Sequence, residues 1–159
     1  MRATARGFTL IELLVVMLLM VIILGMVGLS FTGGEARAVR QESERLALLL
    51  QAAQQEAVLQ GRVYALAVGA SGYEFQVLDG EGKFTVVTQD DVLRPRALPP
   101  AMQILSVTIE GAPLGEAPRI VFLPSGDVPA FVITLSQGTA RWRVEGQING
   151  VIRPVAPDV

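Results

Sequence analysis

One unbroken apolar run near the N-terminus constrains this chain more than any other feature. Residues 13–29 carry no charged or strongly polar side chain, and extending the run back to Phe8 adds only Thr9 and Glu12 as interruptions. As a helix that rises ~1.5 Å per residue, such a segment reaches roughly 33 Å, enough to cross a hydrocarbon core of about 30 Å. The run therefore predicts a membrane-spanning helix.

The flanks of this run predict its orientation. Arg2 and Arg6 precede it, and positive flanks stay on the cytoplasmic side. We therefore expect the N-terminus inside and the chain beyond about residue 30 on the other side of the membrane. A secretory signal peptide would need a shorter apolar core followed by a small-residue cleavage site, and the residues after Leu29 do not form a convincing one. A plain signal anchor is the simpler alternative.

Glu12 is a carboxylate inside the apolar segment, near its start. A charge at the bilayer centre costs roughly 2.5–3.5 kcal/mol on insertion scales, and less near the edge. Residues of this kind usually have a partner. Position alone leaves two interpretations open, a tolerated interfacial charge and one half of an ion pair.

Residues 6–12 read RGFTLIE, which resembles the prepilin peptidase recognition motif of the type IV pilin class. The resemblance implies cleavage between Gly7 and Phe8, and N-methylation of Phe8 by the same peptidase. It also implies that Glu12 pairs with the N-terminal amine of a neighbouring subunit. Two charges that are costly to bury would then meet only when a second subunit arrives. This interpretation makes the apolar helix a membrane anchor first and a filament core later.

Composition argues against an enzyme. The chain has no Cys and no His, so it lacks thiol nucleophiles, thiolate metal sites, and the commonest general base and metal ligand. The formal net charge is −2, and the sequence shows no sign of the basic face that nucleic-acid binders carry. Removing residues 1–7 would leave eleven basic against 15 acidic side chains, since Arg2 and Arg6 leave with the leader. We therefore expect no catalytic residue, no cofactor and no nucleic-acid partner.

The segment 35–60 is predicted to be an amphipathic helix. Its apolar residues recur at helical spacing on one face: Val39, Leu46, Leu50, Ala53 and Ala57. Arg40 and Glu44 stand four residues apart and can support the helix. Gly61 suits a helix stop, whereas Gly33 and Gly34 could mark either a break or a soft spot in one long helix.

After Gly61 the apolar period changes to two, which predicts short strands. The predicted strands are 64–68, 73–78, 84–88, 104–109, 119–123, 131–135, 139–144 and 148–153. The first two read as a hairpin, residues 89–101 and 111–118 read as loops, and Ser125-Gly126-Asp127 reads as a hairpin turn. This pattern favours a small antiparallel β-sandwich or a pair of sheets.

A helix and a sheet with one apolar face each must cover one another. The expected fold class is α+β and pilin-like, with a long N-terminal helix, membrane-spanning in its first half, packed on a small antiparallel sheet domain. The expected division is 1–7 as a cleaved leader, 8–30 as the transmembrane and filament-core helix, 31–61 as the amphipathic continuation of the stem, and 62–159 as a periplasmic β-rich domain.

Two later segments narrow the class. Residues 120–135 read IVFLPSGDVPAFVITL and residues 43–62 read SERLALLLQAAQQEAVLQGR. They resemble the H-type minor pseudopilins of type II secretion systems and the related minor pilins of type IV pili, the GspH/FimT-like group. The resemblance implies a structural subunit near the tip of a periplasmic pseudopilus. Its implied partners are the prepilin peptidase, other minor pseudopilins, the major pseudopilin and the inner membrane. A minor pilin of a type IV pilus is the alternative, and a DNA-uptake receptor is a third possibility.

Two further groups are expected to be structural. Five loop carboxylates could offer oxygen ligands to a hard cation, but their spacing matches no calcium loop: Asp79, Glu81, Asp90, Asp91 and Asp127. Trp142 lies between Arg141 and Arg143 in a predicted strand, so the ring would face the core and both arginines the opposite side. We expect no metal site at the carboxylates and no nucleic-acid patch at the arginines.

Overall fold

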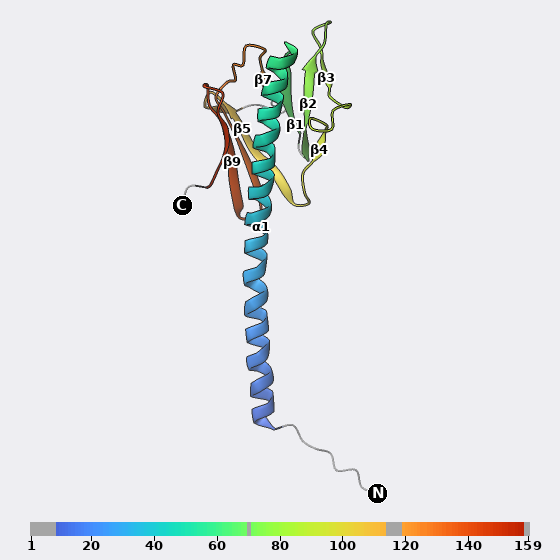
Figure 1. Cartoon of the computed structure of the whole chain (residues 1–159). Helices are drawn as coiled ribbons and strands as arrows, with labels where there is room; N and C mark the ends of the chain where they lie inside the picture. Colours follow the sequence, from blue (N-terminus) through green and yellow to red (C-terminus); the bar gives the residue numbers. More distant parts are fainter. Residues whose placement is uncertain (1–8, 70, 114–118, 158–159) are drawn as a thin grey trace. The chain divides into compact units, whose positions relative to one another are not determined.

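The computed structural model describes residues 9–69, 71–113 and 119–157, without the side chains of 24–32. The chain divides into two compact units, Met1–Gly34 and Glu35–Val159. The one helix of the described residues, α1, is Leu10–Gln60 (Figure 1). Its helical backbone includes Gly33 and Gly34, so the glycine pair does not end it.

The second half of α1 has the buried face that its sequence predicts. Val39, Leu46 and Leu50 have no exposed surface, and the same holds for the alanines at 53 and 57. Gly61 then adopts a φ of 63°, and the Arg62 N–H donates to the Ala57 carbonyl at 3.2 Å. This is the Schellman pattern, in which a residue without Cβ takes the left-handed conformation and ends the helix. The predicted stop at Gly61 is confirmed.

The described residues form ten strands in two antiparallel sheets (Figure 1). Sheet A has the order β3-β2-β1-β7, with β4 also paired to β2, and sheet B has the order β10-β9-β8-β5-β6. The strands of sheet A are β1 Tyr64–Gly69, β2 Gly72–Leu78, β3 Phe84–Val86, β4 Arg96–Ala97 and β7 Arg119–Phe122. Those of sheet B are β5 Met102–Ile109, β6 Ala112–Pro113, β8 Phe131–Gln137, β9 Ala140–Gly146 and β10 Ile152–Val155.

Most predicted strands are confirmed, and the predicted β1–β2 hairpin is present, with Tyr64 opposite Val77. The differences are two additional short strands and a later start of the last strand. Short strands β4 and β6 occupy the predicted loops 89–101 and 111–118. The last strand starts later than predicted, because the Gly150 N–H donates to the Gln147 carbonyl at 2.9 Å and closes a turn there.

The prediction of a hairpin turn at Ser125-Gly126-Asp127 is wrong. The turn itself exists, since the Gly126 N–H donates to the Leu123 carbonyl at 3.0 Å. However, β7 before it pairs in sheet A and β8 after it pairs in sheet B. The connection is held to the helix instead, where the Gln54 side chain donates to the Gly126 carbonyl at 3.1 Å. The turn therefore passes the chain from one sheet to the other.

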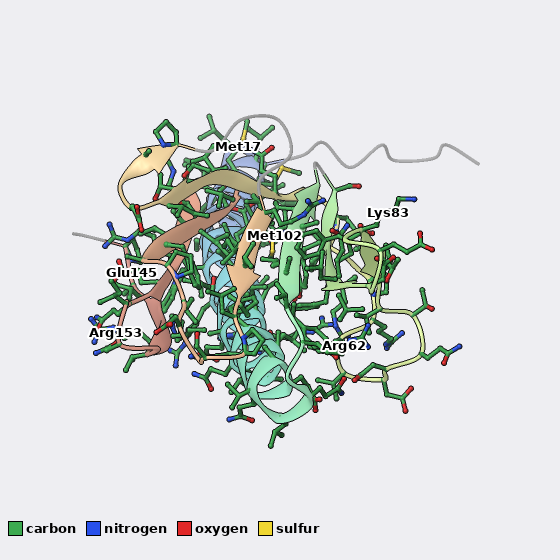
Figure 2. The ribbon with its side chains drawn as sticks, turned by 90° about the horizontal axis from the view of Figure 1, so that it is seen from above. Met17, Arg62, Lys83, Met102, Glu145 and Arg153 are labelled. Carbon is green, nitrogen blue, oxygen red and sulfur yellow. The ribbon has the colours of Figure 1, made fainter. Side chains whose placement is uncertain are left out.

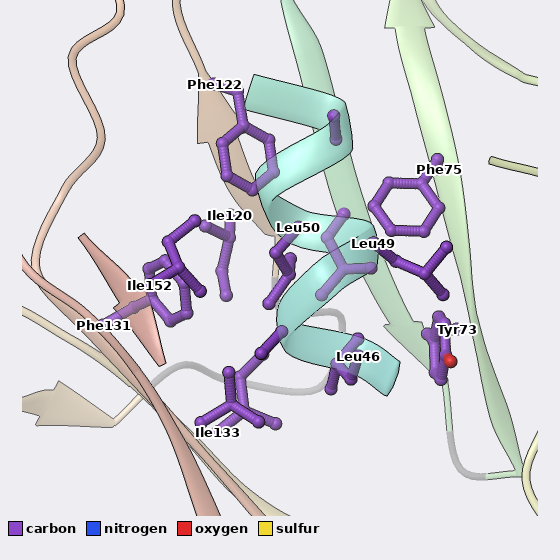
Figure 3. Close-up of a cluster of buried hydrophobic side chains, with 14 of the residues drawn as sticks. Leu46, Leu49, Leu50, Tyr73, Phe75, Ile120, Phe122, Phe131, Ile133 and Ile152 are labelled. Carbon is purple, nitrogen blue, oxygen red and sulfur yellow. The ribbon is translucent and has the colours of Figure 1, made fainter. Parts of the chain in front are cut away.

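The core lies where α1 meets both sheets. Figure 2 shows the strands of sheet B on one flank of the helix and those of sheet A on the other. Large buried side chains come from the helix and from both sheets, and Figure 3 shows seven of them: Leu46, Leu50, Phe75, Ile120, Phe122, Phe131 and Ile133. Beside them, the Gln51 side chain donates to the Ile152 carbonyl at 2.7 Å across 101 residues of sequence. The C-terminal part of the helix is thus tied to the last strand.

Gly146 is expected to tolerate no side chain. A Cβ built there would overlap the ring of Phe131, which is 2% exposed and has no room to move in a packed core. We expect Gly146→Ala to lower the free energy of unfolding by about 1–3 kcal/mol, as overpacking usually does. Denaturant unfolding of a fragment that begins at Glu35 measures this. Gly80→Ala is the matched control, because a Cβ there meets nothing within 4 Å. Equal stabilities of the two variants would contradict the packing argument.

Candidate assembly site

The helix start carries a local signal at Thr9 and Glu12. The Glu12 N–H lies 3.1 Å from the Thr9 carbonyl and 3.4 Å from the Thr9 hydroxyl. Thr9 is therefore the N-cap residue and Glu12 stands at the third helical position, as in a capping box. A carboxylate in the first turn also gains about 0.3–1 kcal/mol from the helix dipole. Thr9 was not predicted as a cap from the sequence, although its T-x-x-E spacing before an apolar run is a known signal for one.

The structure describes only one of the three predicted site residues, Glu12. Gly7 and Phe8 lie outside the described residues. Glu12 is an exposed residue of α1, and it makes no ion pair with any other described residue. The cleavage site and the pairing of Glu12 therefore stay predictions.

The described start of α1 presents apolar side chains on all sides. From Leu10 to Ile23 the exposed fractions run from 44% at Val16 to 80% at Leu10. A helix that is hydrophobic all round normally lies inside a larger protein body or a membrane. Over the described residues, no helix meets the combined length and hydropathy of a membrane span. The predicted span 8–30 includes Phe8 and the side chains of 24–30, which lie outside the description.

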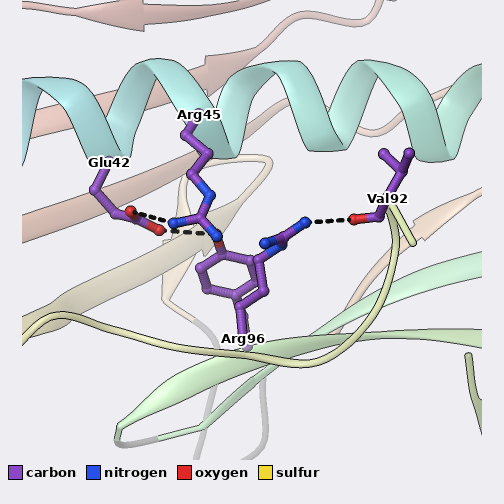
Figure 4. Close-up of polar contacts among 5 residues, drawn as sticks. Glu42, Arg45, Val92 and Arg96 are labelled. Carbon is purple, nitrogen blue, oxygen red and sulfur yellow. Dashed lines mark hydrogen bonds and ion pairs between the residues drawn. The ribbon is translucent and has the colours of Figure 1, made fainter. Parts of the chain in front are cut away.

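A buried polar cluster fixes α1 onto sheet A (Figure 4). Glu42 is 5% exposed, and its carboxylate accepts from the Tyr73 hydroxyl at 2.8 Å and from the Arg45 guanidinium at 3.3 Å. A carboxylate this deep is tolerated only with such partners. Burial, and then the nearby Glu42 charge, raise the pKa of Tyr73 well above its usual value. The cluster has no visible catalytic use, and it sets the position of the helix along the sheet.

Removing the Tyr73 hydroxyl should weaken the globular unit. Tyr73→Phe would leave the buried Glu42 carboxylate one donor short, and we expect a loss of about 1–3 kcal/mol in the free energy of unfolding. Denaturant unfolding of the fragment from Glu35 measures it. Tyr64→Phe is the control, since that hydroxyl donates at 2.9 Å to the exposed side chain of Gln60, which water can satisfy. A smaller loss for Tyr73→Phe than for Tyr64→Phe would contradict this account.

Because of Tyr73, we expect the folded globular unit to lose stability in alkali. The pKa of Tyr73 is raised in the folded state, whereas the unfolded chain titrates near ~10. The folded state therefore holds the phenolic proton more tightly, and the contribution is complete below pH ~10 and decreases as pH rises above it. Unfolding curves measured between pH 8 and 11 should show a steeper alkaline decline for the wild type than for Tyr73→Phe. Parallel declines would show that Tyr73 is not the group responsible.

The loop carboxylates hold turns. The Asp79 carboxylate accepts from the Glu81 and Lys83 N–H groups at 2.9 and 2.8 Å. The Asp90 carboxylate accepts from the Val92 N–H at 2.7 Å. No cluster of metal-binding side chains occurs among the described residues. These hydrogen bonds explain the acids at positions 79 and 90 without a cation.

Trp142 takes the position that alternation predicts. It packs partly buried against the core, with the Arg40 guanidinium 5.7 Å from its ring. Arg40 also pairs with Glu44 at 2.8 Å, as expected. Arg141 and Arg143 occupy the alternate positions of β9, which place them on the opposite face of sheet B.

Comparison with known families decides the assignment. The family model described as type II transport protein GspH matches residues 42–150, which is more than half of the chain and includes both segments that suggested the family. The chain belongs to the GspH family. A second model, the prokaryotic N-terminal methylation motif, matches residues 2–28 of this GspH-family chain.

Individual proteins that are similar to this chain support the same family assignment. Over 153 residues, this GspH-family chain is 30% identical to the type II secretion system protein H of Aeromonas hydrophila, covering 86% of this chain and 83% of the relative. Over 154 residues it is 33% identical to the protein of the same name from Pseudomonas aeruginosa, covering 86% of each. The crystal structure of the minor pseudopilin EPSH from the type II secretion system of Vibrio cholerae superimposes with a TM-score of 0.68 at 21% identity, covering 78% of this chain and 97% of that one. This likeness confirms the predicted α+β, pilin-like fold.

Proposed function

We propose that this chain is a minor pseudopilin, a structural subunit of the periplasmic pseudopilus of a type II secretion system. The observation that carries the proposal is the joint match of the GspH model to residues 42–150 and of the methylation motif to residues 2–28. The two relatives that are 30% and 33% identical to it are both named as proteins of type II secretion. The role is mechanical and interactive, and it involves no catalysis and no cofactor.

The N-terminal segment supplies the processing and assembly steps of this proposal. The prepilin peptidase cuts between Gly7 and Phe8 and methylates the new amine. Residues 8–30 first anchor the chain in the inner membrane, with the N-terminus in the cytoplasm, and later join the filament core. Residues 31–61 continue the stem and 62–159 form the periplasmic domain. The apolar surface of α1 supports this, because exposed Leu and Val side chains need lipid or neighbouring helices to cover them.

The partners follow from this role. In the filament, Glu12 pairs with the amine of an adjacent subunit, and the chain lies near the tip, between other minor pseudopilins and the major one. The methylation motif is common to the whole pilin class, so a minor pilin of a type IV pilus is the alternative. The match to GspH and the names of the relatives favour secretion over piliation.

Deletion of the gene in its own cell tests the proposal. We expect substrates of the type II system to accumulate in the periplasm while surface pili stay normal, and we expect a plasmid copy to restore export. A copy that carries Gly7→Leu is the matched control, since it should be made but not processed and should not restore export. Normal export with lost pili would instead establish the pilus alternative.

A further inference from the structure

The side of sheet B that faces away from α1 has an unusual composition. Residues 131, 133 and 135 of β8 are buried in the core, so Val132, Thr134 and Ser136 point to the opposite side. Each faces a residue of β9 across the ladder, namely Glu145, Arg143 and Arg141. On β10, Arg153 lies opposite Glu145 and Val155 opposite Arg143. On β5, Gln103, Ser106 and Thr108 lie opposite the three β8 residues. We call these eleven residues the sheet B outer face.

This face is positively charged on an acidic chain. It holds three arginines and one carboxylate, whereas the chain as a whole has a formal net charge of −2. The Arg143 Nε lies 3.5 Å from the Glu145 Oε1, and the two side chains are 31% and 25% exposed. Arg141 and Arg153 are exposed. Figure 2 shows Glu145 and Arg153 together on the flank of sheet B that is turned away from the helix.

A bulge places a leucine on the same face. In β5, Gln103 pairs with Ser136 and Ser106 pairs with Thr134, and the register shifts between Ile104 and Ser106. The extra residue is Leu105, and its side chain is 49% exposed. In a regular strand this position would not lie beside Ser106 on one face, and bulges commonly re-aim a side chain in this way. A half-exposed aliphatic side chain therefore lies beside Ser106 and Thr134, and Arg143 lies one strand further on, opposite Thr134.

We propose that the sheet B outer face docks an acidic surface of another subunit of the same filament, with Leu105 of β5 packed against that surface and Arg141 of β9 and Arg153 of β10 bound to its carboxylates. This rests on the proposed function, which supplies the filament. Protein interfaces commonly combine buried apolar side chains with arginines. The arginine fork also matches a carboxylate with two parallel hydrogen bonds.

The composition of the face disfavours the other polyanions. Its surplus of two positive charges is small beside the 6–10 phosphate contacts that DNA binders commonly make. Glu145, which lies opposite Arg153 on this face, would repel phosphates of nucleic acid or lipid. Discrete carboxylates on a folded partner can be placed to avoid it, which gives specificity as well as attraction.

Photo-crosslinking of the full chain in its own cells tests this proposal. A benzophenone amino acid at position 105, in cells that lack the chromosomal copy, should give an adduct that mass spectrometry identifies as another pilin-like subunit. Arg141→Glu with Arg153→Glu should lower the adduct yield about 10-fold or more, because like charges then face each other. Arg62→Glu with Arg94→Glu is the matched control, since both arginines are exposed and the charge change is equal. It should leave the yield unchanged.

A second pair of variants guards against misfolding. Arg141→Lys with Arg153→Lys keeps the charge but loses the fork, so the yield should lie between those of the wild type and the glutamate variant. No adduct at position 105 while export is normal would overturn the docking proposal and leave the proposed function standing. An adduct only with a second copy, with DNA or with lipid would also overturn it. If deletion leaves export intact but position 105 still crosslinks to another pilin-like subunit, the docking stands and the secretion role fails.

Discussion

A leucine at position 7 should leave the chain uncut, so that residues 1–7 stay attached and export stops. Glycine lacks a Cβ and lets the backbone approach another surface closely, which a peptidase needs beside the bond that it cuts. A branched side chain there would hold the bond between Gly7 and Phe8 away from the catalytic groups. We expect Gly7→Leu to remain full-length in peptidase-competent cells. Mass spectrometry of the intact chain measures this directly.

A glycine within α1 provides the control for this experiment. Gly34 lies in α1, and a Cβ built on it meets nothing within 4 Å, so Gly34→Leu should be cut as efficiently as the wild type. Detection of Phe8 as the N-terminal residue of Gly7→Leu would refute the assigned cleavage site. Cleavage failing in both variants would point to a general defect of insertion and would also contradict the role given to Gly7.

Loss of the Glu12 charge should produce a chain that is inserted and cut normally but assembles poorly. The amine of the neighbouring Phe8 would then be buried without its counter-charge, and breaking a buried pair in this way costs about 3–5 kcal/mol. We expect Glu12→Leu to lower both crosslinking to neighbouring pseudopilins and export at least ~10-fold, since 1.4 kcal/mol already corresponds to that factor. Glu12→Asp should do less harm, limited by its shorter reach.

The Thr9 cap at the helix start requires controls that separate the cap from the charge. Glu12→Gln removes the charge, while glutamine still suits the third position of a capping box. Thr9→Ala removes the cap and keeps the charge, at a cost of about 0.5–2 kcal/mol. If pairing matters, Glu12→Gln should resemble Glu12→Leu in assembly, and Thr9→Ala should assemble nearly normally. The reverse order would reduce Glu12 to a helix-capping residue.

Local patterns in the sequence predicted the elements of this fold better than their connections. The period of 3.6 identified Val39, Leu50 and Ala57 as one buried face, and the period of two identified most strands. The turn at Ser125-Gly126-Asp127 was also recognised, but the sheet that the chain enters after it was not. Turn chemistry depends on a few adjacent residues, whereas strand partners depend on pairing between distant segments, here β7 with β1 and β8 with β5.

The candidate sites divide in the same way. Glu12 was found because a carboxylate in an apolar run is conspicuous, and the outward arginines at 141 and 143 followed from strict alternation. The contact of Glu42 with Tyr73 joins residues 31 apart, and no local signal announces it. Leu105 was read as part of a regular strand, because a bulge arises from the mismatch between two strands and leaves no mark in one of them.

The bond between Gln51 and the Ile152 carbonyl affects when the globular unit can fold. During synthesis α1 is complete about 90 residues before β10 appears, since α1 ends at Gln60 and β10 begins at Ile152. Until β7, β8 and β10 have each been made, strands that complete the core around Leu50 are missing. Contacts this distant in sequence slow folding, because the entropy cost of closing a long loop comes before the contacts can stabilise the fold. The apolar face of the amphipathic helix is therefore incompletely covered while most of the strands are synthesised. The globular unit becomes stable only after β10 has been made.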